Sequence, residues 1–123
     1  MTLTLKDELE REQAVKVIHE ARSLVGLSVG DLADMWGIHP RTVLRYTKGA
    51  TSPKLNVRKS LDDLRELAYY LHKVFPRNQK AATNWLYTPE DLLSGRRPID
   101  LVIQGEATKV IHVLAGLYSG AST

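Results

Sequence analysis

A stretch of basic residues with no acidic residue among them is the part of this sequence best suited to bind a polyanion. Between Met35 and Leu61 there is no Asp or Glu, whereas acidic residues are frequent on both sides. The six basic residues of this stretch are Arg41, Arg45, Lys48, Lys54, Arg58 and Lys59. Such a local excess of charge is typical of a phosphate-binding face, although a solvated basic loop would have the same composition. The formal net charge of the whole chain, +3, does not distinguish the two.

The segment 29–49 has the spacing that a pair of short, steeply crossing helices requires. Ala33 is small enough to let the two helices approach, and Gly37 can adopt the positive φ that the turn between them needs. Val43 falls where the second helix must bury an apolar side chain against the first. The other positions expected to face the core are Leu32, Trp36, Ile38 and Tyr46. The pattern therefore predicts a helix-turn-helix.

Both predicted helices have suitable N-terminal residues. Ser28 can cap the first helix, and His39 followed by Pro40 can begin the second. Together with Leu27-Ser28 and Arg45-Tyr46, the segment resembles the phage-repressor-like helix-turn-helix family. In that family the second helix enters the major groove of DNA and presents its outward side chains to the base edges. The alternative is a corner of two helices that has no role in DNA binding.

The resemblance implies a DNA-binding surface around the second helix. The residues assigned to it are Ser28, His39, Arg41, Thr42, Arg45, Lys48, Lys54 and Arg58. Arg41 and Arg45 are expected to contact guanines, and Thr42 a thymine methyl group or a phosphate. The two lysines and Arg58 are expected to bind phosphates, and His39 to cap its helix or touch a phosphate. Leu44 occupies an outward position often held by a polar side chain, where it contacts either a thymine methyl group or a neighbouring subunit.

Nearly every other segment also has helical periodicity, so we expect an all-α fold. The apolar residues between positions 14 and 25 and those between 57 and 75 each mark one face of a helix. Pro76 ends the second of these helices. We therefore expect a repressor-like helical bundle over 1–78 and a small helical domain over 79–123. In the latter, Thr88 is expected to cap a helix that begins at Pro89.

The C-terminal segment 85–120 resembles the toxin-binding domain of the Xre/MbcA/ParS-like antitoxins. The matching residues are Trp85-Leu86, Pro89, Leu92, Gly95, Pro98, Leu101, Gly105, Val110, Leu114 and Gly120. Because they follow a repressor-like segment in the same order, the resemblance covers nearly the whole chain. It implies a type II antitoxin that represses its own operon and neutralises a RES-domain toxin, an enzyme that consumes NAD. The C-terminal segment of such an antitoxin blocks the mouth of the toxin's NAD pocket.

The resemblance also implies which residues contact the toxin. They are Arg96, Arg97, Lys109, His112, Tyr118, Ser119 and Gly120, with the tail continuing to Thr123. Tyr118 is the kind of large amphipathic side chain that anchors interfaces. The alternatives are that Tyr118 closes the core and that at least one of the two arginines caps the preceding turn.

Other classes of function are disfavoured by what the sequence lacks. It has no cysteine, its four histidines show no metal-ligand spacing, and no apolar run approaches the roughly 20 residues that span a bilayer. No phosphate loop or nucleophile elbow occurs, so we expect neither enzymatic activity nor a cofactor. We expect a cytoplasmic protein that binds operator double-stranded DNA and a cognate RES-domain toxin, as a homodimer or a hetero-oligomer with the toxin. A stand-alone repressor whose C-terminal segment only dimerises is the alternative.

Overall fold

The computed structural model describes residues 4–120, and within them it forms helices joined by short turns. In chain order these are α1 (Leu5–Ser23), α2 (Val29–Trp36), α3 (Pro40–Thr47), α4 (Leu55–Val74), α5 (Gln79–Leu86), the 3-10 turn η1 (Asp91–Leu93), α6 (Pro98–Ile103) and α7 (Ala107–Ser119). The prediction of an all-α fold is confirmed. No helix in this part of the chain is long and apolar enough to cross a membrane.

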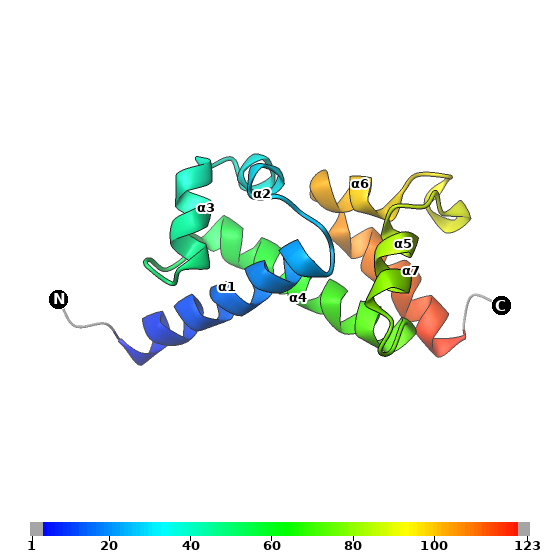
Figure 1. Cartoon of the computed structure of the whole chain (residues 1–123), viewed down its shortest axis with the longest axis horizontal. Helices are drawn as coiled ribbons and strands as arrows, with labels where there is room; N and C mark the ends of the chain where they lie inside the picture. Colours follow the sequence, from blue (N-terminus) through cyan, green and yellow to red (C-terminus); the bar gives the residue numbers. More distant parts are fainter. Residues whose placement is uncertain (1–3, 121–123) are drawn as a thin grey trace.

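Helix α1 begins well before the apolar pattern that predicted it. The hydroxyl of Thr4 accepts a hydrogen bond from the backbone N–H of Asp7, at 3.1 Å, and so caps the helix. Asp7 and Glu8 lie in the first turn, where negative charge is stabilised by the helix dipole. The first residues of α1 therefore extend the helix toward the N-terminus, and in Figure 1 they project beyond the start of α4.

The segment predicted to form a helix-turn-helix consists of α2, a turn at Gly37 and α3. Ser28 and Asp31 make a reciprocal capping box at the start of α2, and Gly37 ends that helix with φ of +64°. The imidazole of His39 accepts a hydrogen bond from the backbone of Arg41 and caps α3. Leu32, Ala33, Trp36, Val43 and Tyr46 are all buried, and Ile38 packs against them.

Helix α4 lies along the middle of the molecule and packs against both halves of the chain. Helices α1 and α2 contact it from the N-terminal half, and α5 and α7 from the C-terminal half (Figure 1). The buried side chains form one cluster that runs through all of these helices. The loop between α1 and α2 is also tied to α5, because the hydroxyl of Tyr87 donates to the carbonyl of Val25 at 3.1 Å. Gly26 has φ of +84°, which favours glycine, and a Cβ there would lie 2.7 Å from that hydroxyl.

The start signal predicted at Thr88 is wrong. Its hydroxyl donates to the carbonyl of Asn84 at 2.6 Å and so closes the end of α5. The residue that caps η1 is Glu90, whose carboxylate accepts from the backbone N–H of Leu92. The hydroxyl of a threonine can donate a hydrogen bond to the free carbonyl four residues earlier, at the end of a helix. A hydroxyl used in this way does not cap the turn that follows.

We expect the two halves to unfold as one cooperative unit, because they share α4. Leu32 in α2 and Leu114 in α7 are both fully buried. Truncation of either residue to Ala is expected to lower the free energy of unfolding by about 2–5 kcal/mol. In both variants the thermal unfolding curve should keep a single transition, with a lower midpoint temperature. Leu117→Ala, at a position 36% exposed, is the matched control and should change stability much less. Separate transitions in the two variants would instead establish independent domains, divided as predicted near residue 78.

Candidate functional site

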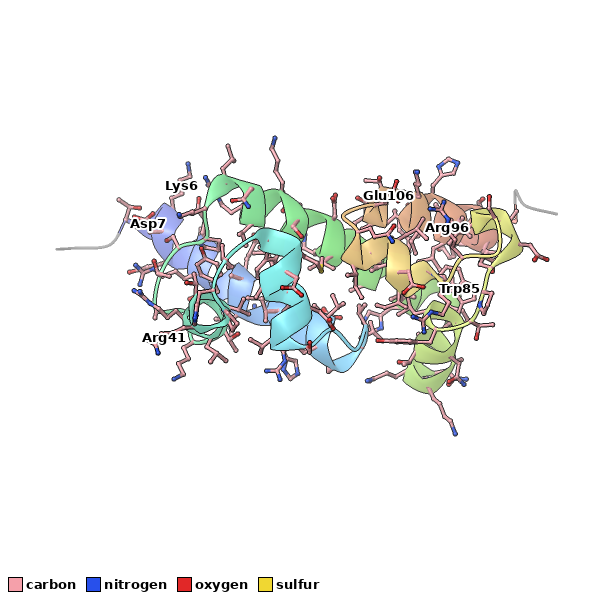
Figure 2. All side chains as sticks on the ribbon, turned by 90° about the horizontal axis from the view of Figure 1, so that it is seen from above. Lys6, Asp7, Arg41, Trp85, Arg96 and Glu106 are labelled. Atoms are coloured by element: carbon pink, nitrogen blue, oxygen red, sulfur yellow. The ribbon has the colours of Figure 1, made fainter. Side chains whose placement is uncertain are left out.

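The outward face of α3 presents three basic side chains. Arg41, Arg45 and Lys48 are exposed and follow one another at intervals of four and three residues, so they lie on one side of the helix. Among the residues that the structure describes, none of the three forms an ion pair. In Figure 2, Arg41 lies toward one end of the molecule, Trp85 and Arg96 lie toward the other, and Glu106 lies between them, nearer the middle. Leu44, 43% exposed, is part of the same surface.

The other predicted DNA-binding residues differ in how available they are. Ser28 and His39 use their side chains as helix caps, so they orient α2 and α3. Thr42 is half-buried beside the exposed face. Lys54 is exposed at the first turn of α4 and makes no capping hydrogen bond. Lys54 therefore extends the basic surface. Ser28 and His39 contribute by orienting the helices that carry the surface.

Arg58 is separated from this basic surface by an acidic partner. Its guanidinium Nη1 lies 2.9 Å from the Oε1 atom of Glu10 on α1. The sequence between Met35 and Leu61 contains no acid, but the fold supplies one from a helix that begins far earlier. Part of the charge of Arg58 is thus neutralised, and the pair fastens α1 to α4. This pairing does not support the prediction that Arg58 contacts a phosphate.

Arg11 is a residue that sequence reasoning missed. Its Nη1 donates to the carbonyl of Ala50 at 3.0 Å and to that of Gly49 at 3.4 Å. Its Nε donates to the hydroxyl of Ser52 at 3.4 Å. It therefore holds the loop that follows α3 and precedes Lys54. Nothing in the sequence marks it, because Arg11 lies among acidic residues and outside the basic stretch.

At the other end of the molecule, η1 and α7 border an open groove of about 440 Å³. It is lined by Leu92, Leu93, Ser94, Arg96, Thr108, Lys109, His112 and Val113. Three of the predicted toxin-binding residues, Arg96, Lys109 and His112, thus meet at one surface. Leu92, 56% exposed, places an apolar side chain beside them. The groove combines an apolar patch with a basic rim.

Glu106 organises the basic rim of this groove. Lys109 donates to Glu106 at 2.7 Å, and Arg96 lies 3.8 Å from the same carboxylate. The hydrogen bond from Lys109, its charge and the charge of Arg96 lower the pKa of Glu106. Arg96 also donates to the carbonyl of Leu93 at 3.2 Å, so it closes the preceding turn as one alternative supposed. These contacts fix the directions in which the rim cations point.

Arg97 and Tyr118 lie apart from these three residues. Arg97 donates two hydrogen bonds to Asp100, at 2.9 and 2.8 Å, and they lower the pKa of that carboxyl. Its guanidinium also lies over the ring of Tyr87, 5.9 Å from the centroid. Tyr118 is 54% exposed in the last turn of α7 and does not close the core, so that alternative is wrong. Ser119 and Gly120 follow it, and residues 121–123 of the predicted tail lie outside the described residues.

We expect Arg11→Ala to loosen the loop after α3 without unfolding the protein. The variant loses the hydrogen bonds to Gly49, Ala50 and Ser52, which are partly exposed and together contribute about 1 kcal/mol. Amide hydrogen exchange in the 49–52 loop should become faster. Lys6→Ala, at an exposed position of the same helix, is the control and should leave that exchange unchanged. Equal exchange in both variants would show that Arg11 does not hold the loop.

Comparison with known proteins places the chain in a family. No family model matches it. It is 33% identical over 96 residues to the mycobacterial cidal antitoxin MbcA of Mycobacterium tuberculosis and of Mycobacterium bovis, a match that covers 78% of this chain and 83% of each relative. Its fold matches one chain of the crystal structure of the M. tuberculosis MbcT–MbcA toxin–antitoxin complex with a TM-score of 0.63 and 31% identity. That match covers 86% of this chain and 94% of the other. The chain therefore belongs to the MbcA antitoxin family and is a regulator rather than an enzyme.

Proposed function

We propose that this antitoxin binds two different partners through surfaces in opposite halves of the molecule. The surface around α3 binds the operator of its own operon, and the surface around η1 and α7 binds a RES-domain toxin and blocks its NAD pocket. The single observation that carries the proposal is that the two basic surfaces lie in opposite halves of the molecule, as Arg41 and Arg96 do in Figure 2. The division into a DNA-binding part, 1–78, and a toxin-binding part, 79–123, follows the same separation.

Operator binding is supported by the geometry of α3. A helix whose N-terminal turn begins with an exposed arginine can enter the major groove and place that arginine against a guanine. Arg41 has this position, and Arg45 follows it one turn later on the same side of α3. Neither arginine is held by a carboxylate among the described residues. Lys48 and Lys54 flank them, and Arg11 fixes the loop that joins these two lysines. In the proposal the arginines read bases, and the lysines bind the phosphates beside them.

We expect Arg41→Ala combined with Arg45→Ala to weaken operator binding by more than about 100-fold, since each two-pronged guanine contact is worth about 1–3 kcal/mol. The measurement is fluorescence anisotropy with DNA from the chain's own promoter, at one fixed salt concentration. Arg65→Ala removes an exposed arginine of α4 and is the matched control. Operator affinity of the double variant equal to that of the control would rule out α3 as the recognition helix.

Toxin binding is supported by the family and by the groove. The structural relative is an antitoxin family member in complex with its toxin. In this chain Leu92 offers an apolar anchor, and Arg96 and Lys109 surround it with fixed cations. A buried apolar anchor inside a polar rim is the usual anatomy of a tight interface. We further propose that Tyr118, exposed at the end of α7, enters the mouth of the toxin's NAD pocket and excludes the dinucleotide by its bulk.

We expect Leu92→Asp to weaken toxin binding by at least about 30-fold, because a charge in the interface core loses its water without gaining a partner. Titration calorimetry with the toxin encoded beside this chain measures the affinity, and toxin-catalysed NAD loss measures neutralisation. Leu55→Asp changes a leucine that is similarly exposed, 61% against 56%, at the other end of the molecule. If both variants bound toxin equally well, the η1–α7 groove would not be the toxin site.

A further inference from the structure

One side of α5 carries polar residues at every fourth position. Gln79, Thr83 and Tyr87 recur at that interval, the last of them as the C-cap, so they lie one above the other on the same side of the helix. Ala82 and Leu86, on the neighbouring side, are the residues that α5 buries in the core. We call the three polar residues the polar strip of α5. They belong neither to the basic surface around α3 nor to the η1–α7 groove.

The first two residues of the polar strip bind carbonyls at the end of α1. The side-chain amide of Gln79 donates a hydrogen bond to the carbonyl of Ser23 at 2.9 Å. The hydroxyl of Thr83 lies 3.0 Å from the carbonyl oxygen of Leu24 and 3.0 Å from that of Gln79, so its one proton is shared between them. Because α1 ends at Ser23, no further helical turn donates to the carbonyls at its end. The strip therefore supplies donors that the helix itself lacks.

Tyr87 extends these contacts into the loop before α2. Its hydroxyl lies 3.1 Å from the carbonyl oxygen of Val25 and 3.3 Å from that of Gly26. Burial and, after it, the charge of Asp31 in the first turn of α2 raise the pKa of Tyr87, so the hydroxyl keeps the proton that it donates. The guanidinium of Arg97 lies over the ring, 5.9 Å from its centroid. The tyrosine is thus held between the loop and Arg97.

Two loops connect the α2–α3 pair to the long helices. Loop 24–28 leads from α1 into α2, and loop 48–54 leads from α3 into α4. Arg11 holds the second loop, and the polar strip holds the first, which in Figure 1 lies between α2 on one side and α5 on the other. The rings of Trp36 and Tyr46, with centroids 6.3 Å apart, join α2 to α3. The two helices therefore form one unit, and side chains from outside it hold the loops at both of its ends.

We propose that the polar strip positions α2 and α3 for reading the operator, with Tyr87 as the principal positioning residue. The inference rests on the proposed operator binding and gives the C-terminal half a part in it. A guanine contact by Arg41 requires a precise placement relative to the lysines that bind phosphates, and Lys54 stands at the start of α4 rather than on α3. Binding to phosphates alone depends on charge and tolerates a shift of the α2–α3 unit. The strip therefore contributes to discrimination between operator and other DNA.

The test compares affinity for the operator with affinity for unrelated DNA of equal length. Fluorescence anisotropy measures both with the full chain at one fixed salt concentration. Tyr87→Phe removes the hydroxyl but retains the ring beneath Arg97. It is expected to weaken operator binding about fivefold, the worth of one hydrogen bond, and to leave binding of unrelated DNA unchanged. Tyr69→Phe, which removes the hydroxyl of an exposed tyrosine on α4, is the matched control.

Two further variants examine the rest of the polar strip. Gln79→Ala combined with Thr83→Val and Tyr87→Phe removes all three donors and is expected to weaken operator binding by at least about tenfold. Thr83→Ser retains a hydroxyl at the same position and is expected to bind the operator as the unaltered protein does.

Toxin affinity separates positioning from a loss of folding. Unfolding would lower the affinities for operator, unrelated DNA and toxin together, whereas a shift of the α2–α3 unit lowers only the first. Operator preference retained by the triple variant, or an equal loss toward all three ligands in Tyr87→Phe, would overturn the inference and leave the proposed function intact. An unaltered protein that shows no preference for its operator would overturn both, and this result is seen before any variant of the strip is compared.

Discussion

Burial of the apolar stripe along α4 is the constraint on which the rest of the structure depends. Leu64, Leu67 and Leu71 are almost fully buried, and each contributes about 1.5–3 kcal/mol by leaving water. Helices from both ends of the sequence supply the surfaces that cover them. Because helices of both halves pack their apolar residues against α4, the two halves are held in a common frame.

That frame explains how so short a chain can present two distinct surfaces. Helix α3 and the η1–α7 groove lie toward opposite ends, and α4 runs along the molecule between them (Figures 1 and 2). The end of α1 and the loop that follows it add a second connection. Gln79 donates to the carbonyl of Ser23, Thr83 to that of Leu24 and Tyr87 to that of Val25. The two surfaces therefore have a fixed orientation relative to each other before either binds a partner.

Charge in this protein is arranged in space rather than along the sequence. Arg58 lies in the acid-free stretch but is paired with Glu10, while Arg11 lies among acids yet serves the basic surface by holding its loop. Arg97, adjacent to a rim residue in sequence, is turned to Asp100 and Tyr87 instead. These contacts decide which cations remain available to a ligand.

The sequence by itself determined the local features of this protein. The pair of short helices α2 and α3 follows from Ala33 and Val43, which are buried, and from Gly37, which has φ of +64° at the turn between them. The caps at Ser28 and His39 and the helix end before Pro76 follow in the same way. Local rules failed at Thr88, where two capping bonds compete, and at the start of α1, which precedes the buried apolar residues that predicted the helix.

Only the tertiary structure decided which cations are paired, that Arg11 supports the loop, and that Arg96, Lys109 and His112 meet at one groove. The physical reason is that these contacts join residues on different helices. Their meeting depends on how the helices pack on α4, and that packing is fixed by burial summed over the whole core. The basic stretch between Met35 and Leu61 therefore predicted a charged surface, and the fold selected the residues that make it.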